Sequence, residues 1–417
     1  MNKKRILFAS VLGNALEFYD FTLYGVFATV IARLYFPSDN EVISLLASWG
    51  AFGTGFLMRP FGAMVFGYIG DKFGRQKALT LSIVLMGVPT LVIGLLPGYA
   101  TLGVLAPIIL ICCRLLQGLC TGGEYNGAGI FAIEHMGRNY PGFASGAITG
   151  SCVIGAITAT AFGSVITGHG DVEWMWRIPF VCGAFVSVIG FYVRRRLTET
   201  PVFKALEKEE DFLQSPFDVV QFCGLEFTKA IMLGLCNGVF SYTLFGFMIT
   251  YLSRYGDIPI AQAMQLNLLG LLAFMVGSPI LGHVAEKMGN EKYFAYGGFV
   301  GLFSVVPCFL LLQSSSLPAI LVGQLILGIL TAGIAGPQHY VLVKLFPAKY
   351  RYSGASMGFS IGMAAGGGSA PIVLIHLIEK TGNTMVPAYF LGVFCFIATW
   401  TLLIDRLPFG ASKARHR

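Results

Sequence analysis

Long apolar runs separated by short polar segments fill most of the 417-residue chain. A helix of about 20 apolar residues spans the hydrocarbon core of a bilayer. Runs of about this length or longer lie at 6–35, 44–69, 78–97, 103–133, 142–167, 175–193, 229–253, 262–285, 293–313, 317–343, 353–377 and 386–404. The pattern predicts an all-α membrane protein with twelve transmembrane helices.

The lysines and arginines gather on one side of the predicted membrane. Most of the 28 fall before the first span, after the last, or in the connections that an inside N-terminus places in the cytoplasm. The outer connections 37–41, 97–101 and 314–316 contain none. By the positive-inside rule, both termini are predicted to be cytoplasmic. The net charge of +7 therefore reflects membrane topology, and we expect no nucleic-acid partner.

Composition supports this class and excludes others. The mean hydropathy is +0.72 and 12% of the residues are charged, about half the share in soluble proteins. The nine cysteines lie mostly in or at the ends of apolar runs and form no Cys-x-x-Cys pair, so we expect neither a disulfide framework nor a metal site. There is no nucleophile–base spacing and no phosphate-binding loop. We expect no enzyme activity, no cofactor and no direct coupling to ATP.

One short motif occurs twice. The connection after the second span reads Gly67-Tyr-Ile-Gly-Asp71-Lys72-Phe-Gly74-Arg75-Gln-Lys77, and the one after the eighth reads Gly282-His-Val-Ala-Glu286-Lys287-Met-Gly289-Asn290-Glu-Lys292. Both have the pattern Gly-x-x-x-acid-Lys-x-Gly-x-x-Lys, which indicates a duplication. The predicted halves are 1–193 and 229–417, joined by a cytoplasmic linker at 194–228 with a short helix at 201–210. Transporters built from two repeats bind their substrate between the repeats.

Arg114, Gln117 and Glu124 lie in the fourth predicted span. Arg114 is roughly 16 Å along a helix from Gly103, and Glu124 is roughly 15 Å further. Charged groups at such depth are costly and usually face a bundle interior or a wet cavity. We interpret these residues as a substrate or proton site. The alternative is an Arg–Glu pair that only holds helices together.

Asn14, Glu17 and Asp20 share one face of the first span, because residues three and four apart are neighbours on a helix. A carboxyl group whose proton affinity responds to burial and to a nearby arginine can take up a proton on one side of a membrane and release it on the other. Glu17 and Asp20 are therefore candidates for proton coupling, or alternatively a structural hydrogen-bonded pair. Arg59 in the second span is either a substrate contact or a structural partner of Asp20.

The second half has fewer polar residues within its spans. Asn237 and Tyr242 lie in the seventh span, and His339 follows Pro337 in the tenth. We interpret them as cavity-lining residues, with a hydrogen-bonded packing role as the alternative for His339. Small residues that allow close helix packing recur in the fourth span at Gly118, Gly122 and Gly123 and in the eleventh at Gly362 and Gly366 to Gly368. Those in the eleventh could instead let the helix bend.

Several pieces of the chain resemble the major facilitator superfamily. The motif around Asp71 is similar to the signature loop of that family. The pieces that resemble its metabolite:proton symporter branch, which includes proline/betaine, ketoglutarate and citrate carriers, are Gly13–Phe21, Arg59–Gly62, Arg114–Glu124, Trp176–Phe180, Glu199–Phe203 and Arg351–Ser356. This resemblance covers nearly the whole chain. It implies two pseudo-symmetric six-helix halves, alternating access and a bacterial inner membrane.

The resemblance also implies a cytoplasmic latch. Loops of this kind hold the cytoplasmic ends of the halves together, because an acid between helix ends accepts hydrogen bonds from a helix N-terminus and pairs with arginine. The residues assigned to the latch are Gly67, Asp71, Lys72, Gly74, Arg75 and Lys77 in the first half and Glu286, Lys287 and Arg351 in the second.

Two cations and three acids fall in the segments that the resemblance assigns to the cavity: Arg59, Arg114, Glu17, Asp20 and Glu124. This mixed set suits a zwitterion, with an arginine for its carboxylate and an acid near its amine. We therefore predict proton-coupled symport of an amino acid or betaine-like metabolite by a monomer in the lipid bilayer. The alternatives are uptake of a di- or tricarboxylate, and a membrane sensor that does not transport.

Overall fold

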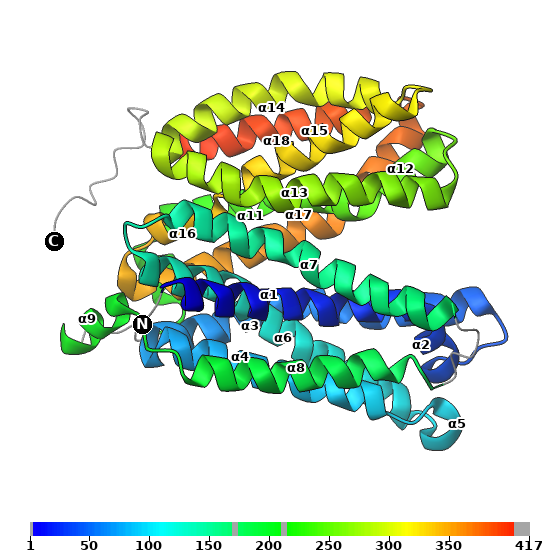
Figure 1. The fold of residues 1–417 in the computed structure, drawn as a ribbon, viewed down its shortest axis with the longest axis horizontal. Coiled ribbons are helices and arrows are strands. Elements are labelled where there is room, and N and C mark those ends of the chain that lie inside the picture. Colours follow the sequence, from blue (N-terminus) through cyan, green and yellow to red (C-terminus); the bar gives the residue numbers. More distant parts are fainter. Residues whose placement is uncertain (1–2, 169–173, 210–214, 404–417) are drawn as a thin grey trace. The chain divides into compact units, whose positions relative to one another are not determined.

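The structure, a computed structural model, describes residues 3–168, 174–209 and 215–403, which form helices and short connections (Figure 1). The first half contains α1 (Lys3–Val26), α2 (Ala28–Tyr35), α3 (Glu41–Phe73), α4 (Arg75–Leu95), α5 (Tyr99–Leu102), α6 (Leu105–Met136), α7 (Pro141–Gly168) and α8 (Arg177–Arg195). The short helices α9 (Pro201–Glu209) and α10 (Asp218–Phe222) follow. The second half contains α11 (Gly224–Tyr242), η1 (Thr243–Phe247), α12 (Met248–Tyr255), α13 (Ile260–Met288), α14 (Asn290–Leu312), α15 (Leu317–Ala335), α16 (Gln338–Leu345), η2 (Ala348–Tyr350), α17 (Arg351–Thr381) and α18 (Val386–Leu403).

The predicted all-α membrane fold is confirmed. Within the described ranges, eleven helical segments are long and apolar enough to cross a membrane. The remaining predicted span, 44–69, lies within the 33-residue helix α3. The linker helix expected at 201–210 is α9, which ends at Glu209; residue 210 lies outside the described residues, as does the basic segment after 403.

Three of the predicted spans are interrupted rather than continuous. The first span is broken at Phe27, between α1 and α2. The seventh contains the π-helical turn η1 between α11 and α12. The tenth is broken between α15 and α16, where Pro337 has no N–H to continue the helix. Pro337 was the one proline at these breaks, and π-helical turns occur frequently at functional sites.

By packing, the described chain divides into two compact units. The first unit comprises Met1–Asn139, Gly150–Gly224 and Val343–Ser360, and the second comprises Tyr140–Thr149, Leu225–Leu342 and Ile361–Arg417. The helices α7 and α17 therefore each contribute their N-terminal segment to one unit and the remainder to the other. The units differ from the predicted halves in these exchanged segments, 140–149 and 343–360.

In the first unit, α3 and α6 pack against each other along much of their length (Figure 1). A methyl group added at Gly118 would overlap the backbone of Gly55, and one added at Gly62 would overlap the backbone of Leu119. The glycines thus let the two backbones come into direct contact, as expected from the small residues of the fourth span. This approach places α3, which carries Arg59, directly against the helix of the other candidate residues.

In the second unit, α13 packs on α15, and α14 packs on α15 and α18 (Figure 1). A methyl group added at Gly362 would overlap the Ile231 backbone, and one added at Gly366 would overlap the Leu235 backbone. The helix α17 continues without interruption through Pro371. Of the two interpretations of these glycines, the structure supports close packing.

Candidate substrate site and charged network

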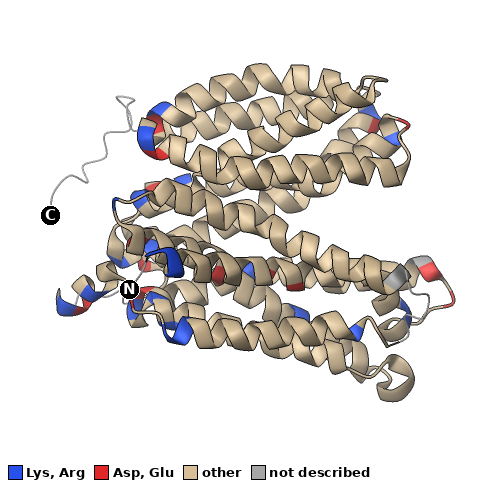
Figure 2. Cartoon of the chain, viewed as in Figure 1, with Lys and Arg blue, Asp and Glu red and all other residues tan. Residues whose placement is uncertain are grey.

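Charged side chains are distributed differently in the two units. In the second unit they lie near the helix ends, whereas in the first some also lie midway along helices (Figure 2). Buried in the first unit are Glu17, Asp20, Arg114 and Glu124, each at most 3% exposed. Charges buried away from water need polar partners or a ligand. Their contacts therefore define the candidate site.

A chain of hydrogen bonds connects α1, α4 and α6. The Thr90 hydroxyl donates to the Asp20 carboxylate at 2.9 Å. The Gln117 amide donates to the Thr90 oxygen at 2.9 Å, and Nη1 of Arg114 donates to the Gln117 carbonyl oxygen at 2.8 Å. Three predicted site residues are thus brought together through Thr90, which the sequence analysis did not identify.

Arg114 keeps one edge of its guanidinium group without a partner. Its Nε and Nη2 atoms are buried and donate no hydrogen bond to the described residues, and it forms no ion pair with a described carboxylate. These two nitrogens form the side of the guanidinium that binds a carboxylate through two parallel hydrogen bonds. A buried charge without an opposite charge or a full set of hydrogen bonds destabilises the folded protein. The free edge of Arg114 is therefore a candidate for binding a carboxylate.

Glu17 is a second buried group without a fixed partner. Neither of its carboxylate oxygens accepts a hydrogen bond from the described residues. The Thr121 hydroxyl lies beside it but donates to the Gln117 backbone carbonyl at 3.0 Å. On the same face of α1, the Asn14 amide donates to the Ser151 hydroxyl of α7 at 2.8 Å. Glu17 is therefore a buried acid of this face whose carboxylate is left without a hydrogen bond by the described residues.

Glu124 is paired, but not with Arg114. It forms an ion pair with Arg194 at the end of α8 and accepts a hydrogen bond from Ser82 of α4. Arg194 also donates to the Leu79 carbonyl at 2.8 Å. The expected alternative of an Arg114–Glu124 pair is therefore not formed. The sequence pattern hid this contact because Arg194 follows the sixth predicted span and looked like an ordinary cytoplasmic cation.

Arg59 lies against aromatic rings and forms no ion pair with the described residues. Its guanidinium carbon is 4.5 Å from the centre of the Phe56 ring and 4.9 Å from that of Phe21. It forms no ion pair with a carboxylate of the described residues, Asp20 included. The geometry thus does not support the interpretation of Arg59 as a structural partner of Asp20.

The candidates of the second unit form a separate polar cluster. Asn237 of α11 donates to the side-chain oxygen of Gln338 at the start of α16, and the Gln338 amide is 3.3 Å from the His339 ring. The Ser241 hydroxyl donates to Asn237 at 2.7 Å. Gln338 links the two predicted residues and was missed. Tyr242, the remaining predicted residue, lies against Gly367, and a methyl group added at Gly367 would overlap the Tyr242 ring.

Asp71 is the centre of a network of charged residues in the first unit. Its carboxylate accepts hydrogen bonds from the backbone N–H groups of Tyr352 (3.1 Å) and Ser353 (2.8 Å), in the first turn of α17. It also pairs with Arg75 at 3.2 Å. Arg75 donates in turn to the Ala348 carbonyl at 2.7 Å. An acid at a helix N-terminus and beside an arginine is the geometry expected for the latch.

Glu134, at the end of α6, extends this network and was missed by the sequence analysis. It forms an ion pair with Arg351 at 2.8 Å and lies 3.5 Å from Nε of Arg75. It also accepts a hydrogen bond from the Thr200 hydroxyl at 2.6 Å, and Thr200 caps the start of α9 by accepting from the Phe203 N–H. The linker helix is thus tied to the same acid as the start of α17.

The other residues assigned to the first latch have different surroundings. Lys72 donates to the Tyr68 hydroxyl at 2.5 Å, away from the acids, and Lys77 is exposed. A methyl group added at Gly67 would collide with the Ser353 backbone. Gly74 has φ of +115°, which only glycine adopts readily, and lies against Glu199. The two glycines therefore permit the turn and the approach of α17.

The second copy of the motif repeats one of these contacts in the second unit. Glu286 accepts a hydrogen bond from the Gly142 N–H, in the first turn of α7, at 2.9 Å. The same carboxylate lies 3.6 Å from the His283 ring, whereas Lys287 is exposed. Each copy of the motif thus uses its acid to bind a helix N-terminus, but an arginine accompanies only the acid of the first.

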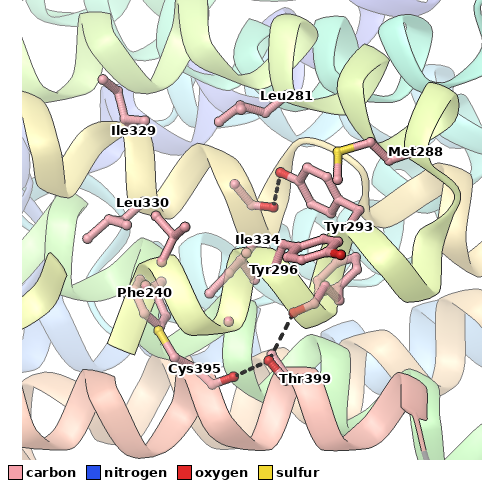
Figure 3. Close-up of a pocket in the computed structure, with 17 residues that line it drawn as sticks. Phe240, Leu281, Met288, Tyr293, Tyr296, Ile329, Leu330, Ile334, Cys395 and Thr399 are labelled. Carbon is pink, nitrogen blue, oxygen red and sulfur yellow. Dashed lines mark hydrogen bonds between the residues drawn. The ribbon is translucent and has the colours of Figure 1, made fainter. Parts of the chain in front are cut away.

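The second unit also contains a pocket of about 250 Å³, lined by residues of α11, α13, α14, α15 and α18 (Figure 3). Two of its polar side chains, Tyr293 and Thr399, are already paired. The Tyr293 hydroxyl donates to the Gly333 carbonyl at 2.9 Å, and the Thr399 hydroxyl donates to carbonyls of Phe294 and Cys395. No charged side chain lines it. It is therefore unsuited to a charged metabolite, and the candidate site remains in the first unit.

Solved structures with the same fold are transporters. The proton:xylose symporter XylE superposes with a TM-score of 0.74 at 14% identity, covering 97% of this chain and 95% of that one. The human organic anion transporter MFSD10 superposes with a TM-score of 0.68 at 16% identity, covering 96% of this chain and all of that one. At these identities, the likeness concerns the fold alone.

Sequence relatives are closer. The proline/betaine transporter of Salmonella typhimurium is 32% identical over 95% of this chain and 82% of its own. The putative proline/betaine transporter of Staphylococcus aureus is 34% identical over 94% of this chain and 86% of its own. The glycine betaine/proline/ectoine/pipecolic acid transporter of Dickeya dadantii is 30% identical over 95% of this chain and 82% of its own. The family model of the Major Facilitator Superfamily matches residues 10–370 and 230–416. Because the family model matches nearly the whole length of the chain, and because the chain has the fold of these transporters, the chain belongs to the Major Facilitator Superfamily.

Proposed function

We propose that this protein is a secondary active transporter that brings a small zwitterion, an amino acid or a betaine-like metabolite, across the bacterial inner membrane together with protons. The relatives named proline/betaine transporters support this substrate class. The observation that carries the proposal is the unpartnered, buried edge of Arg114, in the same hydrogen-bonded chain as Asp20. A substrate carboxylate would satisfy that edge, while a neighbouring acid faces the ammonium group.

We assign proton coupling mainly to Glu17. It is buried and has no hydrogen-bond partner among the described residues, and Arg59, Arg194 and Glu124 are close enough to act on it electrostatically. Binding a substrate at Arg114 changes the charge balance of this set and therefore the proton affinity of Glu17. Glu124 contacts Arg194 of α8 and Ser82 of α4. We propose that it couples the change in charge near Glu17 to the positions of these two helices.

Opening and closing of the cytoplasmic side is assigned to the network of Asp71, Arg75, Glu134 and Arg351. These residues tie the first turn of α17 to α3 and α6, so alternating access requires their contacts to break and re-form. The polar cluster of Asn237, Gln338 and His339 is assigned to the contribution of the second half to substrate binding. The protein is proposed to act as a monomer, without a cofactor or a catalytic reaction.

Proteoliposomes test the energy source. With an imposed inward proton gradient, the wild-type protein is expected to accumulate labelled proline or glycine betaine, and a protonophore should abolish the accumulation. The Glu17→Gln variant keeps the shape of the site but cannot release a proton, so it should still exchange substrate across the membrane without concentrating it. The exposed acid Glu379 provides the matched control, since Glu379→Gln should concentrate substrate normally. Accumulation driven by sodium at uniform pH would reject the proton assignment.

A further inference from the structure

The two copies of the repeated motif differ in the basic group that accompanies the acid. In the first unit, Asp71 pairs with Arg75 at 3.2 Å. In the second unit, the basic group beside Glu286 is the ring of His283, one turn earlier on α13, whose Nδ1 lies 3.6 Å from the Glu286 carboxylate. An arginine is charged at every physiological pH, whereas an ordinary histidine gains its charge near pH 6.5. The second copy can therefore respond to a change of pH that leaves the first copy unaffected.

The contact between His283 and Glu286 depends on the charge of the ring. A separation of 3.6 Å is too long for a hydrogen bond, and Nδ1 of His283 is buried without a hydrogen-bond partner among the described residues. A neutral ring therefore adds little, but a protonated ring at the same place forms an ion pair. The side chains of His283 and Glu286 are 26% and 17% exposed, so water reaches both and the ring can exchange a proton with the solvent.

Glu286 holds the start of α7. It accepts a hydrogen bond from the Gly142 N–H at 2.9 Å. A methyl group added at Gly142 would overlap the Gly282 carbonyl oxygen, so the backbones of α7 and α13 are in direct contact here. Residues 140–149 belong to the second unit, and from Gly150 onward α7 belongs to the first. The contact made by Glu286 therefore acts on a helix that the two units share.

Glu286 is the acid that a proton on His283 would face. The titratable and charged groups on α13 and on the elements beside this end of it are Arg138, Tyr140, Glu286, Lys287, Glu291 and Lys292, and α15, which packs along α13, has none. The Tyr140 ring centre is 5.3 Å from that of His283. Arg138, Lys287, Glu291 and Lys292 are exposed, and water and salt screen exposed charges. The protonated ring would therefore be attracted mainly by Glu286.

We propose that His283 is a pH sensor that fastens the start of α7 to α13 when the solution at this end of the protein becomes acidic, and thereby slows transport. This inference rests on the proposed function, which places the motif at the cytoplasmic side and brings protons in with the substrate. Below about pH 6.5, a protonated His283 attracts Glu286 and steadies its bond to Gly142. Above that pH, the attachment relies on the Gly142 hydrogen bond and on helix packing. Protons delivered to the cytoplasm would thus restrain further transport.

Hydrogen exchange of the backbone amides at the start of α7 tests the sensor without a substrate. Mass spectrometry on the full-length protein in lipid nanodiscs compares the wild type with His283→Gln at one pH at a time, which removes the intrinsic effect of pH on exchange. At pH 5.5, His283→Gln should exchange about three- to fivefold faster than the wild type, as expected for the loss of a partly exposed ion pair. At pH 8, the two proteins should exchange equally.

Two further substitutions separate the charge of the ring from its shape. His283→Arg carries a charge at both pH values, so it should exchange about three- to fivefold more slowly than the wild type at pH 8. In a Glu286→Gln background, His283→Gln should change nothing, because the acid that the ring attracts has gone. The exposed His376, on α17 of the same unit, provides the matched control; His376→Gln should exchange like the wild type at both pH values.

Counterflow of labelled proline, with the same pH on both sides of proteoliposomes, tests the effect on transport. The wild type should exchange substrate about threefold more slowly than His283→Gln at pH 5.5, and at the same rate at pH 8. Equal hydrogen exchange of the two proteins at pH 5.5, or a difference of the same size at pH 8, would overturn the sensor; equal counterflow at pH 5.5 would overturn its control of transport. A wild-type protein that exchanges no zwitterion would instead reject the proposed function, and hydrogen exchange would still decide whether His283 senses pH.

Discussion

Arg114→Lys is expected to weaken binding of the zwitterionic substrate by about 2–5 kcal/mol while the protein remains folded. The free edge of Arg114, Nε with Nη2, presents two parallel donors to a carboxylate. A lysine ammonium is a point charge on a flexible stem and cannot reproduce that fork. Lysine would also lose the planar contact with the Tyr24 and Phe52 rings. Titration of purified protein with glycine betaine measures the loss.

Arg177 provides the matched control for this substitution. It is a partly buried arginine of the first unit, and it donates to the backbone carbonyls of Gly94 (3.0 Å) and Leu96 (2.7 Å), away from the candidate site. Arg177→Lys should bind substrate with nearly wild-type affinity, because a lysine can still reach a carbonyl. If Arg114→Lys binds as tightly as the wild type, Arg114 is a structural residue and the carboxylate site must lie elsewhere.

Asp71→Asn is expected to slow transport at least tenfold while leaving equilibrium substrate binding nearly unchanged. The carboxylate accepts two backbone N–H groups from the start of α17 and pairs with Arg75. An amide has one acceptor oxygen and no charge, so it can retain at most part of this arrangement, and a charge-assisted hydrogen bond is about twice as strong as a neutral one. The initial rate of uptake and the dissociation constant, measured on the same preparation, separate the two effects.

Glu207 offers the comparison on the linker helix α9. It is exposed and takes no part in the network, so Glu207→Gln should transport at the wild-type rate. A variant Asp71→Asn that transports normally would contradict the gating role. Loss of binding in a correctly folded Asp71→Asn protein would instead mean that this network shapes the substrate site directly.

The features that the sequence could predict are those with a local or repeated signal. Membrane helices follow from apolar length, and a short motif that appears twice indicates the duplication, while the role of Asp71 as a helix-terminus acceptor came from the family resemblance of that motif. The burial of Arg114 and Glu124 was predicted from depth in the membrane, which helix rise converts directly from sequence position, whereas the grouping of Asp20 with Arg114 came from the family resemblance.

The features that it could not predict depend on which helices touch. The partner of Glu124 is Arg194, 70 positions further along the chain. The local sequence around neither residue indicates that α8 ends beside α6. Thr90 and Gln338 connect predicted residues, yet each looks like an ordinary polar residue in an apolar span. Gly25 precedes the break at Phe27 by two residues, but glycine is common in membrane helices and does not by itself indicate a break.

Ligand-induced thermal stabilisation of the purified wild-type protein tests the central claim most directly. A ligand that binds only the native state at about 100 times its dissociation constant stabilises it by about 2.7 kcal/mol. We expect glycine betaine and proline to raise the unfolding temperature, and ketoglutarate and citrate to leave it unchanged, because the buried acids Glu17, Asp20 and Glu124 oppose further negative charge near Arg114. Stabilisation by the carboxylates, with none by the zwitterions, would contradict the account.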